Sequence, residues 1–176
     1  MKNRNRLISH LRTSFCALAI ADASLMLPSA EAGTPQPASG QFFPCFNYAG
    51  PPRQVGENLI ITFNISGTIN GTFTGSLAGT ELDVVHRDGS ITKHGSAVLA
   101  GSITGRPGTG TLHFTFEGIG NAVTGHEVLR GMARQGTGAL AGVYVEETLE
   151  GDVGAPEPGC NFSGAGTYSG QILFAP

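Results

Sequence analysis

Ile65-Ser-Gly-Thr-Ile-Asn-Gly-Thr-Phe-Thr-Gly-Ser-Leu-Ala-Gly79 is the stretch that decides the fold, because glycine recurs in it at every fourth residue from Gly67. Side chains alternate between the two faces of a strand, so the glycines share one face with larger apolar residues. The residues of this face are Gly67, Ile69, Gly71, Phe73, Gly75, Leu77 and Gly79. Small and large residues that alternate on one face fit the tapering interior of a small β-barrel. Threonine and serine on the other face suit solvent and favour strands. This stretch therefore predicts a barrel wall.

The course of the chain around this stretch has two interpretations. Asn70-Gly71 is a strong hairpin signal and predicts a turn, whereas the long glycine pattern would also fit one bent strand. Beyond Gly79 the apolar residues move to even positions, at Leu82 and Val84. A bulge or turn near Gly79 would produce that change of phase.

Asp88-Gly89 is a second hairpin signal. A two-residue turn at this point pairs Asp83 with His94 across the two strands. Both side chains then point outward, so we expect a solvent-exposed ion pair rather than an acid–base pair.

A turn over residues 118–121 predicts that His113 and His126 face each other across the next hairpin. No third ligand is identifiable beside them, so we interpret them as exposed polar residues and predict no metal site. The same register places Glu127 on the inward face. A carboxylate inside a barrel must be paired, hydrated or functional.

Turn signals divide the chain into a total of about seven to nine antiparallel strands with short turns, and no helical periodicity occurs. No predicted helix covers a sheet face, so closure into a barrel best satisfies the strand edges. We therefore predict an all-β fold, a closed antiparallel up-and-down barrel of about eight strands over residues 55–176. Residues 33–54 are predicted to be a flexible leader that carries an aromatic and cysteine-containing segment.

The N-terminal residues 1–32 have the features of a cleaved signal peptide. Basic residues precede an apolar run from Phe15 to Leu27, and Ala30-Glu-Ala32 matches a signal-peptidase site. Cleavage after Ala23 is the alternative. The run is too short and interrupted to span a membrane, so a secreted or periplasmic protein is expected.

Two of the three cysteines, Cys45 and Cys160, remain after such cleavage. An even pair in an exported chain predicts a disulfide, which would tie the segment before the first confident strand to the segment before the last. Two unpaired buried thiols are the alternative.

Three segments give the chain a family resemblance: Gly101-Ser-Ile-Thr-Gly-Arg-Pro-Gly-Thr109, Gln135-Gly-Thr-Gly-Ala-Leu-Ala-Gly-Val143 and Asp88-Gly-Ser90. With the glycine-patterned strand, they resemble the allene-oxide-cyclase-like barrel proteins, and in particular an uncharacterised bacterial secreted family of that fold. The resemblance covers roughly residues 58–174. It implies an eight-stranded barrel of the allene oxide cyclase or lipocalin type with a central cavity. The plant members are cyclases or isomerases of a fatty-acid epoxide.

We expect the barrel interior to hold a small apolar ligand. If the pattern of Gly138 to Tyr144 continues, Tyr144 and Glu146 also face inward. The residues predicted to line the cavity are Phe73, Leu99, Phe114, Phe116, Glu127, Tyr144, Glu146 and Tyr168. No catalytic residue is assigned. An isomerase or cyclase acting on a lipid-like substrate, and a structural or interaction barrel with a filled core, are the alternatives.

The charge of the chain argues against two classes of binding partner. The chain has a formal net charge of −3 and no basic stripe, which argues against nucleic acid and anionic membranes as partners. No phosphate loop, nucleophile elbow or zinc spacing occurs, so no cofactor is predicted. The sequence leaves the oligomeric state open.

Overall fold

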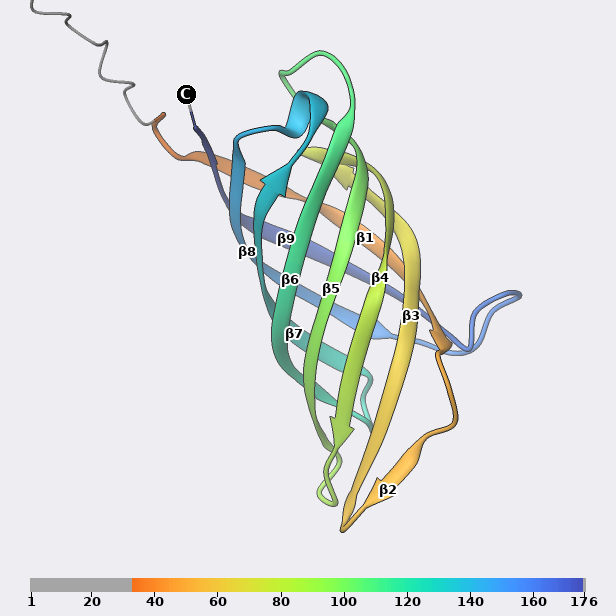
Figure 1. Ribbon diagram of the computed structural model, residues 1–176. Helices are drawn as coiled ribbons and strands as arrows, with labels where there is room; N and C mark the ends of the chain where they lie inside the picture. Colours follow the sequence, from red (N-terminus) through yellow and green to blue (C-terminus); the bar gives the residue numbers. More distant parts are fainter. Residues whose placement is uncertain (1–32, 176) are drawn as a thin grey trace, which may run out of the picture.

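The computed structural model describes residues 33–175, most of which are in β-strands (Figure 1). No α-helix occurs in this part of the chain, and no helix in it is long and apolar enough to cross a membrane. The elements are β1 (Gln36–Tyr48), β2 (Arg53–Val55), β3 (Asn58–Gly71), β4 (Phe73–Val85), β5 (Ser90–Ile103), β6 (Gly110–Asn121), β7 (His126–Gly136), the 3-10 turn η1 (Gly138–Leu140), β8 (Val143–Val153) and β9 (Phe162–Phe174).

Eight of these strands form a closed antiparallel barrel. Each strand from β3 to β9 pairs with the next along the chain, and β1 closes the ring by pairing with both β9 and β3. The short strand β2 adds to the free end of β3. Figure 1 shows η1 at the upper end of the barrel and β2 at the lower end. The predicted up-and-down barrel is confirmed.

The glycine-patterned stretch forms a hairpin rather than one bent strand. β3 ends at Gly71, which adopts φ +103°, and β4 begins at Phe73. A Cβ at Gly71 would lie 2.5 Å from the Cα of Gly40, so both the backbone angle and the close approach of β1 require glycine. Across the hairpin, Ile69 pairs with Gly75, which keeps small residues opposite large ones on the inner face.

The hairpin between β4 and β5 has a longer loop than the sequence predicted. Arg87, Asp88 and Gly89 form a three-residue loop, with Gly89 at φ +83° and its N–H donating to the His86 carbonyl. A type I turn followed by a left-handed glycine has this geometry. The register therefore shifts by one residue, and Asp83 pairs with Lys93 instead of His94.

The unbroken alternation of β4 corrects two further predictions, because without a bulge its odd-numbered residues stay on the inner face. Asp83 is buried rather than exposed, and Leu82 faces solvent. No bulge follows Gly79, since β4 pairs without interruption from Phe73 to Val85 with β5.

The predicted leader over residues 33–54 is wrong for β1, which is part of the barrel wall. Phe42 and Phe46 point inward and are buried, while β1 pairs with β3 from Gly40 to Tyr48. Ring closure needs this eighth strand, and that long-range requirement is not visible in the local sequence. The predicted signal peptide, residues 1–32, lies outside the described residues.

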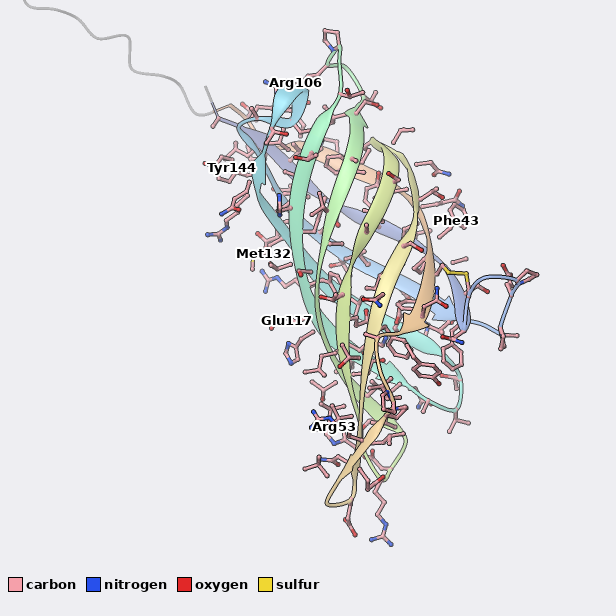
Figure 2. The ribbon with its side chains drawn as sticks, turned by 45° about the vertical axis from the view of Figure 1, so that its right-hand side comes forward. Phe43, Arg53, Arg106, Glu117, Met132 and Tyr144 are labelled. Carbon is pink, nitrogen blue, oxygen red and sulfur yellow. A yellow bond between two sulfur atoms is a disulfide. The ribbon has the colours of Figure 1, made fainter. Side chains whose placement is uncertain are left out.

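The disulfide between Cys45 and Cys160 is present, with 5.4 Å between the Cα atoms (Figure 2). It joins β1 to the loop before β9. A cross-link between residues 115 positions apart restricts the unfolded chain strongly.

Two apolar clusters fill the barrel at different heights. The upper core includes Phe73, Leu99 and Tyr168, all of them almost completely buried. The Tyr168 hydroxyl accepts a hydrogen bond from the Phe73 N–H and donates one to the Asn70 carbonyl. The lower core contains Phe46 and Phe63 with neighbouring apolar residues. The candidate site lies between the two cores.

Candidate functional site in the barrel interior

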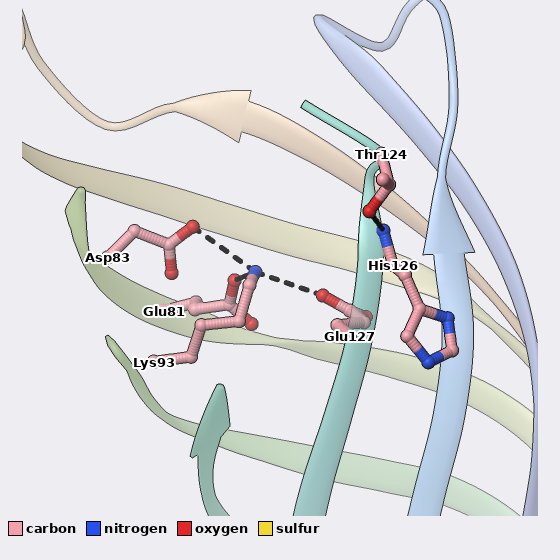
Figure 3. Close-up of polar contacts among 6 residues, drawn as sticks. All are labelled: Glu81, Asp83, Lys93, Thr124, His126 and Glu127. Carbon is pink, nitrogen blue, oxygen red and sulfur yellow. Dashed lines mark hydrogen bonds and ion pairs between the residues drawn. The ribbon is translucent and has the colours of Figure 1, made fainter. Parts of the chain in front are cut away.

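A buried ammonium group with three carboxylates occupies the lower interior of the barrel. The Nζ atom of Lys93 lies 2.5 Å from a Glu81 oxygen, 3.1 Å from an Asp83 oxygen and 3.0 Å from a Glu127 oxygen (Figure 3). All four residues are less than 5% exposed. They come from β4, β5 and β7, which the corrected register brings to one level. We call these four residues the Lys93 cluster.

The protonation of the Lys93 cluster follows from burial and from its excess of carboxylates. Burial, opposed by the attraction of Lys93, raises the pKa of Glu81 to about 8. Burial also raises the pKa of Glu127. Burial alone would lower the pKa of Lys93, but the three carboxylates raise it above its ordinary value. Lys93 is therefore charged at neutral pH, and Glu81 is largely protonated there.

An internal cavity of about 70 Å³ separates the Lys93 cluster from the upper core. Its walls are mainly apolar and include four phenylalanine rings. Glu81 and Glu127 reach it from the Lys93 cluster, and Glu147 reaches it from β8. The aromatic residues in its wall are Phe42, Phe46, Phe114 and Phe116.

Glu147 is the carboxylate of this cavity that lacks a cation. It is 4% exposed, and its Oε2 atom has no hydrogen-bond partner within residues 33–175. Burial raises the pKa of Glu147 to about 7. Such a group is half protonated near neutral pH and can accept or donate a proton there.

Glycines on both neighbouring strands make room for Glu147. Gly131 of β7 and Gly170 of β9 are its direct cross-strand partners. A Cβ at Gly131 would lie 3.0 Å from the Glu147 Cγ, and one at Gly170 would lie 2.8 Å from the Glu147 Cβ. The larger side chain therefore stands between two small neighbours on the inner face.

The structure separates the predicted cavity residues into three groups. Phe114, Phe116 and Glu127 line the cavity, and Glu127 is buried on the inner face. A second group lies in the packed upper core instead of the cavity wall: Phe73, Leu99 and Tyr168.

The third group, Tyr144 and Glu146, faces solvent, so the prediction that they point inward is wrong. Tyr144 is 42% exposed on the outside of the barrel (Figure 2), and Glu146 pairs with exposed Arg130. The turn η1 and Gly142, at φ +70°, reset the alternation before β8 begins. Glu147 takes the inward position as a result.

The predicted facing of His113 and His126 is also wrong. The turn lies at residues 122–125 rather than 118–121, with Gly125 at φ +75°, and His113 pairs with Gln135. His126 contacts an Asp152 oxygen at 3.1 Å on the surface.

Sequence reasoning missed Glu81, Lys93 and Glu147 and placed Asp83 on the outer face, although all four residues belong to the site. The inward positions of Glu81 and Asp83 follow from the uninterrupted alternation of β4, and the length of the loop before Ser90 brings Lys93 opposite them. For Glu147, a signal does exist in the glycines at positions 131 and 170, but it can be recognised only when the strand register is known.

The fold and the interior define a class: a closed eight-stranded β-barrel with a cavity that contains buried carboxylates. No protein-family model and no curated protein matches the chain. Among solved structures, it is similar to a protein of unknown function from the DUF3224 family of Shewanella oneidensis. The TM-score is 0.61 and the identity 18%, over 81% of this chain and 99% of that chain. At this identity the similarity supports the barrel fold alone.

Proposed function

We propose that the barrel binds a small, largely apolar ligand in the cavity beside Glu147. The unpartnered Oε2 atom of Glu147 in an apolar cavity is the observation that carries this proposal. A buried carboxyl group without a hydrogen bond costs stability, so a polar group of a ligand would compensate this cost on binding. Apolar walls with a small number of convergent polar groups are typical of ligand sites.

The size of the cavity limits the ligand. A cavity of 150 Å³ holds benzene, so about 70 Å³ corresponds to a molecule of roughly three or four heavy atoms. Drug-sized ligands and lipids need sites of roughly 300–1,000 Å³. The rigid barrel therefore favours a compact molecule over a fatty acid.

An isomerase or cyclase is the second candidate, favoured by the pKa of Glu147 near 7, which suits a general base at neutral pH. The resemblance to allene-oxide-cyclase-like proteins points in the same direction. A lipid-like substrate would require the walls to move apart. A structural barrel with a filled core is the third candidate, and it predicts that nothing binds in the cavity.

We also propose that the protein is secreted or periplasmic, as its N-terminal sequence and its disulfide suggest. N-terminal sequencing of protein from its own host should then begin at Gly33, or at Ser24 if the alternative cleavage is used. A chain that begins at Met1 would contradict export with cleavage.

Filling the cavity tests the binding proposal. Ala97 lines the cavity, so Ala97→Leu should occupy it and abolish binding of isopropanol, a four-atom probe, detected by ligand-observed NMR. Ala100 lies exposed on the same strand, and Ala100→Leu serves as the matched control. Binding that survives in Ala97→Leu, or no binding of any small probe to the unaltered protein, would contradict the proposal.

A further inference from the structure

The charges inside the barrel point to the class of ligand. Among the Asp, Glu, Lys and Arg side chains of residues 33–175, the buried ones are four carboxylates and one ammonium group: Glu81, Asp83, Glu127, Glu147 and Lys93. Lys93 is already in contact with three of these carboxylates. Glu147 therefore remains as the carboxylate for which the protein supplies no cation.

The cavity wall adds a second feature that favours cations. Phe42, Phe46, Phe114 and Phe116 contribute aromatic rings, whose faces attract positive charge. The barrel already holds one ammonium group in this way, since the Lys93 Nζ lies 5.5 Å from the centre of the Phe46 ring. An aromatic wall with a carboxylate is a combination that recognises organic ammonium ions.

We propose that the ligand is a small alkylammonium ion whose N–H donates to Glu147 while its alkyl groups contact the phenylalanine rings. This inference rests on the proposed function, the binding of a small ligand in the cavity. A hard metal cation fits less well, because it requires several oxygen ligands and the free carboxylate of the cavity is Glu147 alone. An anion such as a fatty-acid carboxylate would face four carboxylates and one lysine, and is disfavoured.

The affinity for such a cation should depend on pH, because the cation and a proton compete for the Glu147 carboxylate. The groups that face the cavity with Glu147 are Glu81 from β4 and Glu127 from β7, both paired with Lys93 from β5, and Tyr168 lies nearby on β9. An ammonium ion binds the ionised form of Glu147. Its affinity should therefore rise with pH, by up to about tenfold per unit below the pKa of Glu147, and level off above it.

Three probes of equal size and different charge test the inference: isopropylammonium, isopropanol and acetate, each with four heavy atoms. At pH 8 we expect isopropylammonium to bind at least about tenfold more tightly than isopropanol, because charge-assisted hydrogen bonds are stronger, and acetate not to bind. The isopropylammonium ion stays protonated throughout this range, as lysine does. Affinities measured by NMR titration from pH 5 to 8 should show the predicted rise for the cation alone.

Glu147→Gln should remove the preference for the cation and its pH dependence while isopropanol still binds. The matched control is Glu146→Gln, one residue away on the outer face, which should leave all three affinities unchanged. Equal affinity of isopropanol and isopropylammonium, or a cation preference that persists in Glu147→Gln, would overturn the inference and leave the binding proposal intact. Failure of all three probes would overturn both.

Discussion

Replacing Lys93 by methionine is expected to lower the free energy of unfolding by about 3–5 kcal/mol at pH 8, the range for a buried ion pair that loses one partner. The substitution leaves Glu81, Asp83 and Glu127 in the barrel interior without their cation. Chemical denaturation followed by far-UV circular dichroism measures the loss. The loss should be smaller at pH 5, because carboxyl groups that bind protons no longer bury uncompensated charge.

Arg130→Met is the matched control for this prediction. Arg130 is also paired with a glutamate, Glu146, but both side chains are exposed, so its replacement should change stability little. If Lys93→Met and Arg130→Met have equal effects at pH 8, the Lys93 cluster does not contribute to stability as its burial requires.

Glu147→Gln is expected to change how stability depends on pH. The pKa of Glu147 is about 7 in the folded protein and 4.5 in an unperturbed chain. Between these values the folded state binds a proton that the unfolded state does not, so this group lowers stability as pH rises. Relative to the variant, the unaltered protein should lose about 3 kcal/mol from pH 4 to pH 8.

The measurement is the free energy of unfolding of both proteins at several pH values, with Glu146→Gln as the control. The curves of the unaltered protein and Glu147→Gln should diverge between pH 4.5 and pH 7 and run parallel above about pH 8. Parallel curves over the whole range would show that Glu147 is ionised normally in the folded protein.

The barrel fold could be predicted from the sequence because inward and outward residues alternate along each strand. Glycines that alternate with Ile69 and Phe73 define an inner face locally, and Asn70-Gly71 marks its turn. Cys45 and Cys160 could be paired because they are the two cysteines outside the predicted signal peptide. The alternation and the turn can be recognised from neighbouring residues, and the disulfide from the number of cysteines. The structure confirms all three predictions.

The site was harder to predict because it depends on register. Uninterrupted alternation in β4 places Asp83 inside, and one extra residue in the loop before Ser90 pairs it with Lys93 instead of His94. A left-handed Gly142 likewise decides whether Glu146 or Glu147 points inward. Such turns differ by little in local sequence, yet they reverse the orientation of a whole strand. Burial of four carboxylates in one barrel also opposes the ordinary preference of charged residues for solvent.

The proposed binding site depends on Glu147 being a buried carboxyl group without a cation. Its titration can be followed directly by the side-chain carboxyl ¹³C signal in protein labelled at glutamate, with the signal assigned by its absence in Glu147→Gln. A midpoint near pH 7 that moves to lower pH when isopropylammonium is added is the expected result, because the cation stabilises the ionised form. A midpoint near 4.5 that the cation does not move would show an ordinary, solvated carboxylate and contradict the site.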